Sequence, residues 1–172
     1  MPENIRRYSK LLIAIHWSTA VLVLIAYLVS VGGHSVRAHA PVLHFACGLA
    51  VLALVLPRLI ARLAGGAPPA LASGGPRLVL AAKLGHAALY FLLVAVPLTG
   101  WYAASRLGVP INLYGLHIPA IAAAVRGRIG PVSEIHQVGG NLILILAGLH
   151  AAMGLWHQFV YRDRTLERMQ PF

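Results

Sequence analysis

Residues 11–31 have the sequence LLIAIHWSTAVLVLIAYLVSV, which contains no charged side chain. About 20 apolar residues in a helix are enough to cross the hydrocarbon core of a bilayer, so this stretch predicts a membrane-spanning helix. A cleaved signal peptide is the alternative interpretation. However, the apolar run is longer than the core of a typical signal peptide, and no clear small-residue cleavage pattern follows it. We therefore expect this helix to be retained.

Three further apolar stretches are long enough to span a membrane, at about residues 42–63, 84–104 and 135–161. The segments that join the four stretches are rich in Gly and Pro, which is typical of connections. The third connection, residues 105–133, is the longest. The sequence therefore predicts an all-α membrane protein in which residues 1–172 form one domain, a bundle of four transmembrane helices.

The composition supports a membrane location and suggests an orientation. The 172 residues are 59% hydrophobic and only 10% charged, whereas a soluble domain carries about 25% charged residues. Ten of the 14 Lys and Arg residues lie on the side of the two termini, and the other four, Arg37, Arg106, Arg126 and Arg128, lie on the opposite side. Because Lys and Arg are enriched in cytoplasmic loops, both termini should be cytoplasmic. The positive charges flank the membrane and are not interleaved with aromatic residues, so we expect lipid contacts and no nucleic-acid binding.

The scarcity of acids and cysteines excludes several kinds of site. No carboxylate occurs between Asn4 and Ser133, which rules out a glycosidase carboxylate pair, an oxygen-rich calcium loop and a Ser-His-Asp triad within the apolar body. The single cysteine, Cys47, rules out internal disulfides and a Cys-x-x-Cys-His haem attachment site. The nine histidines are therefore the residues most suited to carry the chemistry.

Four histidines form two pairs when they are placed by depth in the membrane. His136 and His150 are 14 residues apart on the fourth helix, so they lie within about 40° of the same face and roughly 21 Å apart along the axis. His16 lies near the level of His150, and His44 lies near the level of His136. The pattern predicts that each pair binds one metal from opposite sides.

The pairs fit haem better than a bare metal ion. A closed zinc site needs four ligands, and no Cys, Asp or Glu lies at a suitable depth. A haem iron needs only two axial ligands, because the porphyrin supplies four nitrogens. Small residues follow each candidate by one helical turn and would leave room for a flat ring: Ala20, Gly48, Gly140 and Gly154. Close helix packing also favours small residues in membranes, so these positions have a structural alternative.

Two other histidines near the terminal side are not expected to be haem ligands. His86 has Tyr90 one turn later and no partner left at its depth once His16 is assigned. We interpret His86 as a residue beside the haem or near a quinone, together with Tyr90, Lys10 and Lys83. His157 lies close to the cytoplasmic end of the fourth helix, and we interpret it as a group at the cytoplasmic membrane interface.

Motifs along nearly the whole chain resemble the bacterial cytochrome b561 family of small four-helix inner-membrane proteins with two haems. They are Arg-Tyr-Ser-Lys at 7–10, Ile15-His16-Trp17, Leu43-His44-Phe45-Ala46-Cys47-Gly48, Gly85-His86 with Tyr90, Pro97-Leu98-Thr99-Gly100-Trp101, His136, and Gly148-Leu149-His150-Ala151.

The resemblance implies a ligand set and a function. The matching histidines are His16 with His150 for the cytoplasmic-side haem b, and His44 with His136 for the periplasmic-side haem b. The chain is most similar to the branch that oxidises superoxide to oxygen and reduces ubiquinone. That likeness implies an oxidoreductase whose protein residues position the redox centres and supply no catalytic side chain. The periplasmic Arg residues, with His39 and His117, would then attract the superoxide anion.

Two other functions are compatible with the histidine pattern. Cytochrome b subunits that anchor dehydrogenases or hydrogenases also carry two histidines 14 residues apart, and they pass electrons between a partner and quinone within a larger redox complex. A histidine-lined metal permease without haem is a third hypothesis, although the scarcity of membrane carboxylates argues against it.

Overall fold

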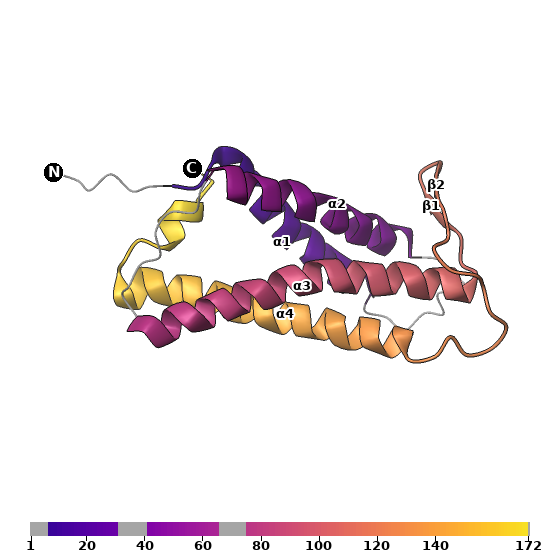
Figure 1. Cartoon of the computed structure of the whole chain (residues 1–172). Coiled ribbons are helices and arrows are strands. Elements are labelled where there is room, and N and C mark those ends of the chain that lie inside the picture. Colours follow the sequence, from indigo (N-terminus) through magenta and orange to yellow (C-terminus); the bar gives the residue numbers. More distant parts are fainter. Residues whose placement is uncertain (1–6, 31–40, 66–74, 172) are drawn as a thin grey trace.

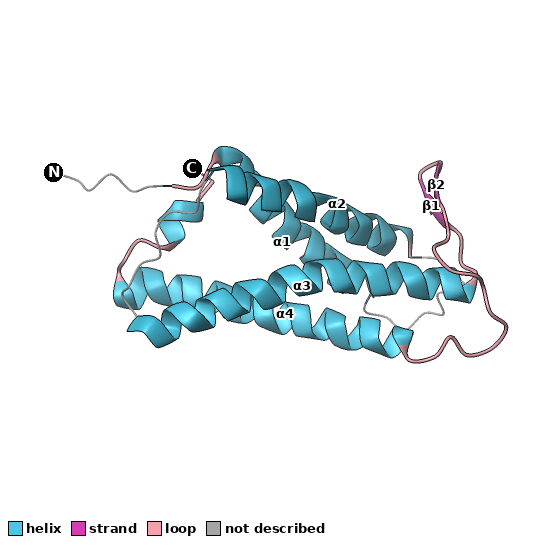
Figure 2. Ribbon diagram, in the orientation of Figure 1, coloured by secondary structure: helices cyan, strands magenta, loops and turns pink. Residues whose placement is uncertain are grey.

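The computed structural model describes residues 7–30, 41–65 and 75–171, and its main elements are four long helices (Figures 1 and 2). The helices are α1 (Lys10–Ser30), α2 (Val42–Gly65), α3 (Gly75–Leu107) and α4 (Val132–Trp156). All four are long and apolar enough to cross a membrane. This confirms the predicted all-α bundle of four spanning helices. The predictions for Arg37 and His39 lie outside the described residues.

The helices pack as two neighbouring pairs. α1 lies against α2, α3 lies against α4, and α2 and α3 join the pairs (Figure 1). A small core between them contains Val51, Val55, Leu92, Leu93 and Ile143. Outside this core, many large apolar side chains face outward, with exposed fractions of 83% for Leu63 on α2 and 69% for Phe91 on α3. Helices that are apolar all round are suited to lipid, where only their backbone groups need internal hydrogen bonds.

The segment after α4 returns to the start of α1. It begins with a π-helical turn, η1 (His157–Tyr161), and ends with a 3-10 turn, η2 (Leu166–Met169). The Tyr8 N–H donates to the Arg168 carbonyl at 3.2 Å, and Trp17 Nε1 donates to the Met169 carbonyl at 2.8 Å. We call this the tail end of the bundle.

The opposite end of the bundle carries a feature that the sequence analysis did not predict, a short hairpin. Strands β1 (Ile111–Leu113) and β2 (Leu116–Ile118) pair in antiparallel register, with Leu113 opposite Leu116. Both loop residues have positive φ, 49° at Tyr114 and 99° at Gly115. This is the backbone of the two-residue turns that suit the twist of hairpin strands. We call this the hairpin end (Figure 1).

Candidate functional site

The structure brings the four predicted histidines together as the two expected pairs. His44 from α2 faces His136 from α4, with 5.8 Å between their ring centroids. His16 from α1 faces His150, also from α4, with 6.2 Å between centroids. The first pair lies toward the hairpin end and the second toward the tail end.

The spacing within each pair fits a metal atom between the two rings. An imidazole nitrogen binds a metal at about 2.0–2.1 Å, so two imidazoles on opposite sides of one metal have centroids roughly 6 Å apart. The ring planes cross at 85° in the first pair and 70° in the second. Axial ligation directs one nitrogen of each ring toward the metal and leaves the angle between the planes free. The geometry therefore suits two axial ligands.

No group of three or more His, Cys, Asp or Glu side chains in the described part of the chain is arranged to hold a metal ion. Each pair would therefore need further ligands from outside the protein. A porphyrin supplies four nitrogens in one plane, which leaves two axial positions for a histidine pair.

Hydrogen bonds orient the pair at the hairpin end for ligation. His44 Nδ1 lies 2.8 Å from the Ala26 carbonyl, and His136 Nδ1 lies 2.9 Å from the Val96 carbonyl. A carbonyl only accepts, so each Nδ1 carries the proton and donates. Each Nε2 is then free to bind a metal, and the backbone contact fixes the orientation of the ring.

Open space lies beside the same pair. Built Cβ atoms at Gly48 and Gly140 would meet nothing within 4 Å. At the tail end, a Cβ at Gly154 would meet the Leu166 side chain at an ordinary 3.7 Å. The space at Gly48 and Gly140 is what a flat macrocycle between His44 and His136 requires.

Gly100 has a structural role that the sequence analysis missed. A Cβ at this position on α3 would lie 2.7 Å from Cε1 of His136 and 3.0 Å from its Nδ1. Glycine is therefore needed for the ring of His136 to lie against α3 and reach the Val96 carbonyl. The motif that contains Gly100 was noted in the sequence, but only the fold shows that it contacts the ring.

We expect Gly100→Ala to displace the His136 ring and to destabilise the protein by about 1–3 kcal/mol, the usual cost of overpacking. Gly85→Ala is the matched control on the same helix, because a Cβ there meets nothing within 4 Å. Alanine at position 85 should be neutral or stabilising by roughly 0.5–1 kcal/mol. Thermal unfolding followed by circular dichroism in detergent compares the two variants. Equal stability of both would contradict the steric role of Gly100.

The pair at the tail end has more neighbours than expected. The ring of His86 on α3 lies 5.2 Å from that of His150, centroid to centroid. The expectation that His86 has no partner at its depth is therefore wrong. Depth was estimated along each helix separately, and the packing of α3 against α4 brings these two rings together. His86 Nδ1 donates to the Ala82 carbonyl at 2.7 Å.

An arginine also contacts this pair. Arg58 Nη2 on α2 lies 2.9 Å from His16 Nδ1, and the guanidinium carbon lies 5.2 Å from the ring centroid of Tyr90. From the sequence alone, Arg58 is only one of the ten basic residues on the side of the termini. Its contact with a predicted ligand is therefore new information from the fold.

The last predicted histidine, His157, is held by the tail. Its Nδ1 lies 2.5 Å from Asp163 Oδ2, while Asp163 Oδ1 accepts hydrogen bonds from the backbone N–H and hydroxyl of Thr165. Beyond it, Arg164 forms an ion pair with Glu167, and these hydrogen bonds lower the pKa of the Glu167 carboxyl. These contacts stabilise the turn that returns the chain to α1.

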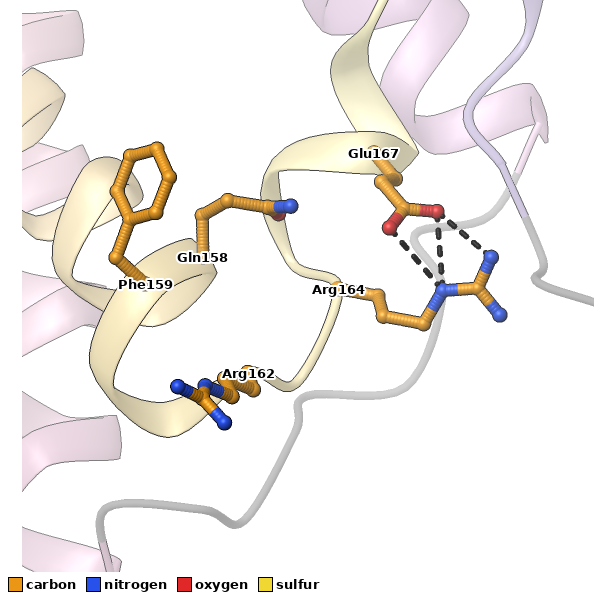
Figure 3. Close-up of a pocket in the computed structure, with 5 residues that line it drawn as sticks. All are labelled: Gln158, Phe159, Arg162, Arg164 and Glu167. Atoms are coloured by element: carbon orange, nitrogen blue, oxygen red, sulfur yellow. Dashed lines mark hydrogen bonds and ion pairs between the residues drawn. The ribbon is translucent and has the colours of Figure 1, made fainter.

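A polar cavity of about 410 Å³ lies at this turn (Figure 3). It is lined by Gln158, Phe159, Arg162, Arg164 and Glu167. None of the histidines of the two pairs lines it. The cavity is therefore separate from the candidate haem sites.

The chain is similar to known proteins along nearly its whole length. Residues 7–171 match the family model described as prokaryotic cytochrome b561. The chain is 32% identical to a probable superoxide oxidase CybB of Yersinia pestis over 96% of its own length and 97% of the relative's. It is 31% identical to cytochrome b561 homolog 2 of Escherichia coli strain K12, covering 95% and 90% of the two chains. It is also 33% identical to a cytochrome b562 of Cereibacter sphaeroides, covering 94% of each. The chain thus belongs to the prokaryotic cytochrome b561 family of membrane proteins, which bind b-type haem and transfer electrons across the membrane.

Proposed function

We propose that this protein holds two b-type haems and passes electrons from superoxide at one membrane face to ubiquinone. The observation that carries the proposal is the pair of facing histidines near each end of the bundle, with centroid distances of 5.8 and 6.2 Å. His44 and His136 would hold one haem, and His16 and His150 the other. When bound, a haem iron with two histidine ligands exchanges single electrons and has no open coordination position.

The electron count sets the stoichiometry of the proposed reaction. Each superoxide loses one electron and becomes oxygen. Ubiquinone gains two electrons and two protons and becomes ubiquinol. Two superoxide anions are therefore consumed for each ubiquinone reduced.

The charges at the hairpin end support superoxide as the donor. Arg126 and Arg128 are exposed there, and Glu134 begins the nearby helix α4 as a single carboxylate among the described residues of this end. A net positive surface raises the encounter rate of a small anion. The name of the Yersinia relative points to the same donor. In the proposed orientation, the hairpin end lies in the periplasm and both termini lie in the cytoplasm, with the protein in the bacterial inner membrane.

The tail end would then be the side on which ubiquinone is reduced. Two residues of α3 lie close to the His16–His150 pair. The ring of His86 lies beside that of His150, and the Arg58 guanidinium, which contacts His16, lies over the ring of Tyr90. Lys83 lies one turn before His86 on the same helix and is exposed. This group offers polar side chains beside an apolar membrane surface, as a quinone headgroup requires.

An optical redox spectrum of the detergent-purified protein, with the haem extracted and counted per chain, tests the proposal. We expect two low-spin b haems per polypeptide, reduced by superoxide and reoxidised by ubiquinone. Two haems that do not respond to superoxide would instead indicate a cytochrome b subunit of a larger redox complex. A protein without haem would contradict the proposal and favour a role of the histidines in metal transport or in the structure.

A further inference from the structure

Arg58 has an unused hydrogen-bonding edge beside the His16–His150 pair. Its Nη2 contacts His16 Nδ1 at 2.9 Å, while its Nε is buried and has no hydrogen-bond partner among the described residues. Nε and Nη2 lie on the same edge of the guanidinium. Arginine binds a carboxylate through such an edge, with two parallel N–H···O bonds.

Among the described residues, no carboxylate contacts this edge. Among the described acids, Glu134 belongs to the first turn of α4 at the hairpin end, Asp163 contacts His157, and Glu167 pairs with Arg164. Arg58 is partly buried within a spanning helix. A buried charge without a counter-charge is strongly unfavourable. An anion at this position would therefore be strongly stabilising, and the described residues supply none.

Ligation of His16 would release the second donor of the same edge. In the observed contact, Arg58 donates and His16 Nδ1 accepts, so the neutral ring carries its proton on Nε2. A ring that binds a metal through Nε2 carries its proton on Nδ1, which then donates and no longer accepts from Arg58. With His16 acting as a ligand, Nε and Nη2 are both available.

We propose that this edge of Arg58 binds a propionate carboxylate of the haem held by His16 and His150. The inference rests on the proposed function, because it requires a haem at this pair. Propionates are the carboxylate groups of a b-type haem, and they would supply the missing anion. Arg58 is then an anchoring residue for one of the two haems.

Haem release to a scavenging protein in excess tests the anchor, with Arg58→Gln compared to the full-length wild type. We expect the haem at the His16–His150 pair to leave at least tenfold faster from Arg58→Gln, while release from the other pair is unchanged. Arg58→Lys should be intermediate, because it keeps the charge but lacks the two-donor edge. Arg62→Gln is the matched control, since it removes the same charge one turn further along α2, and its release rate should equal that of the wild type.

Haem dimethyl ester separates carboxylate binding from a general effect of charge. Reconstituted with this esterified haem, wild type and Arg58→Gln should lose it from the His16–His150 pair at the same rate. The wild type should also lose the ester at least tenfold faster than native haem, a comparison that holds even if Arg58→Gln does not fold. Equal release of native and esterified haem by the wild type would overturn the inference and leave the two-haem proposal intact. A wild type that binds no haem would instead refute the proposed function.

Discussion

His44→Ala and His136→Ala should each remove the same haem, and His16→Ala and His150→Ala should each remove the other. Each substitution deletes one of the two proposed axial ligands of a haem. The histidines of the other pair are too far away to replace the lost ligand. His136 and His150 are separated by roughly 21 Å along α4. Haem extraction and low-temperature optical spectra should show one haem instead of two in each variant, with the same spectral component missing within a pair.

His117→Ala is the matched control for these four substitutions. His117 lies in the hairpin, where its Nδ1 contacts the Asn112 side chain at 2.9 Å, and it belongs to neither pair. It should keep both haems. The decisive comparison is at the tail end, where both His16 and His86 lie close to His150. If His86→Ala removed a haem and His16→Ala did not, the ligand assignment at this end would be wrong.

Gly140→Leu should abolish haem binding at the hairpin end while the helices remain folded. The space beside Gly140 is open within 4 Å of a built Cβ, and it adjoins His136 by one helical turn. Leucine would fill the space that a macrocycle needs. Because leucine has a better helix propensity than glycine by almost 1 kcal/mol, weakening of α4 would not explain the loss.

The second proposed haem, at His16 and His150, provides the control for Gly140→Leu. The component assigned to His16 and His150 should remain, and helicity by circular dichroism should be equal to or above that of the wild type. Gly140→Ala adds a single carbon and should reduce occupancy less than leucine does. Full occupancy of both haems in Gly140→Leu would show that the macrocycle does not lie against this glycine.

The sequence was sufficient to predict the four helices and the two facing pairs. Both follow from regular helix geometry, since the rise per residue converts chain position into depth in the membrane. His16, His44, His136 and His150 could therefore be matched by depth before their neighbours were known. The family resemblance selected the same four residues independently.

The contacts around the pairs could not be predicted in this way. The depth of a residue in the membrane does not determine how α3 is rotated relative to α4. That rotation brings His86 against His150 and Gly100 against His136. Arg58 was placed at the membrane boundary by its charge, whereas its side chain reaches back to His16. The hairpin was missed because its turn uses Tyr114-Gly115, a less familiar choice than Asn-Gly.

The position of both second ligands on α4 has a consequence for biosynthesis. A chain emerges from the ribosome with its amino terminus first, at about 5–20 residues per second. His16 and His44 are therefore made and inserted well before His136 and His150, which lie on the last of the four helices. Neither of the proposed coordination sites can form until that helix has joined the bundle, so cofactor loading should follow synthesis of α4. A product truncated before α4 would hold only one proposed ligand of each pair, His16 and His44, and should remain colourless. Colour would then distinguish incomplete chains from mature protein in the membrane.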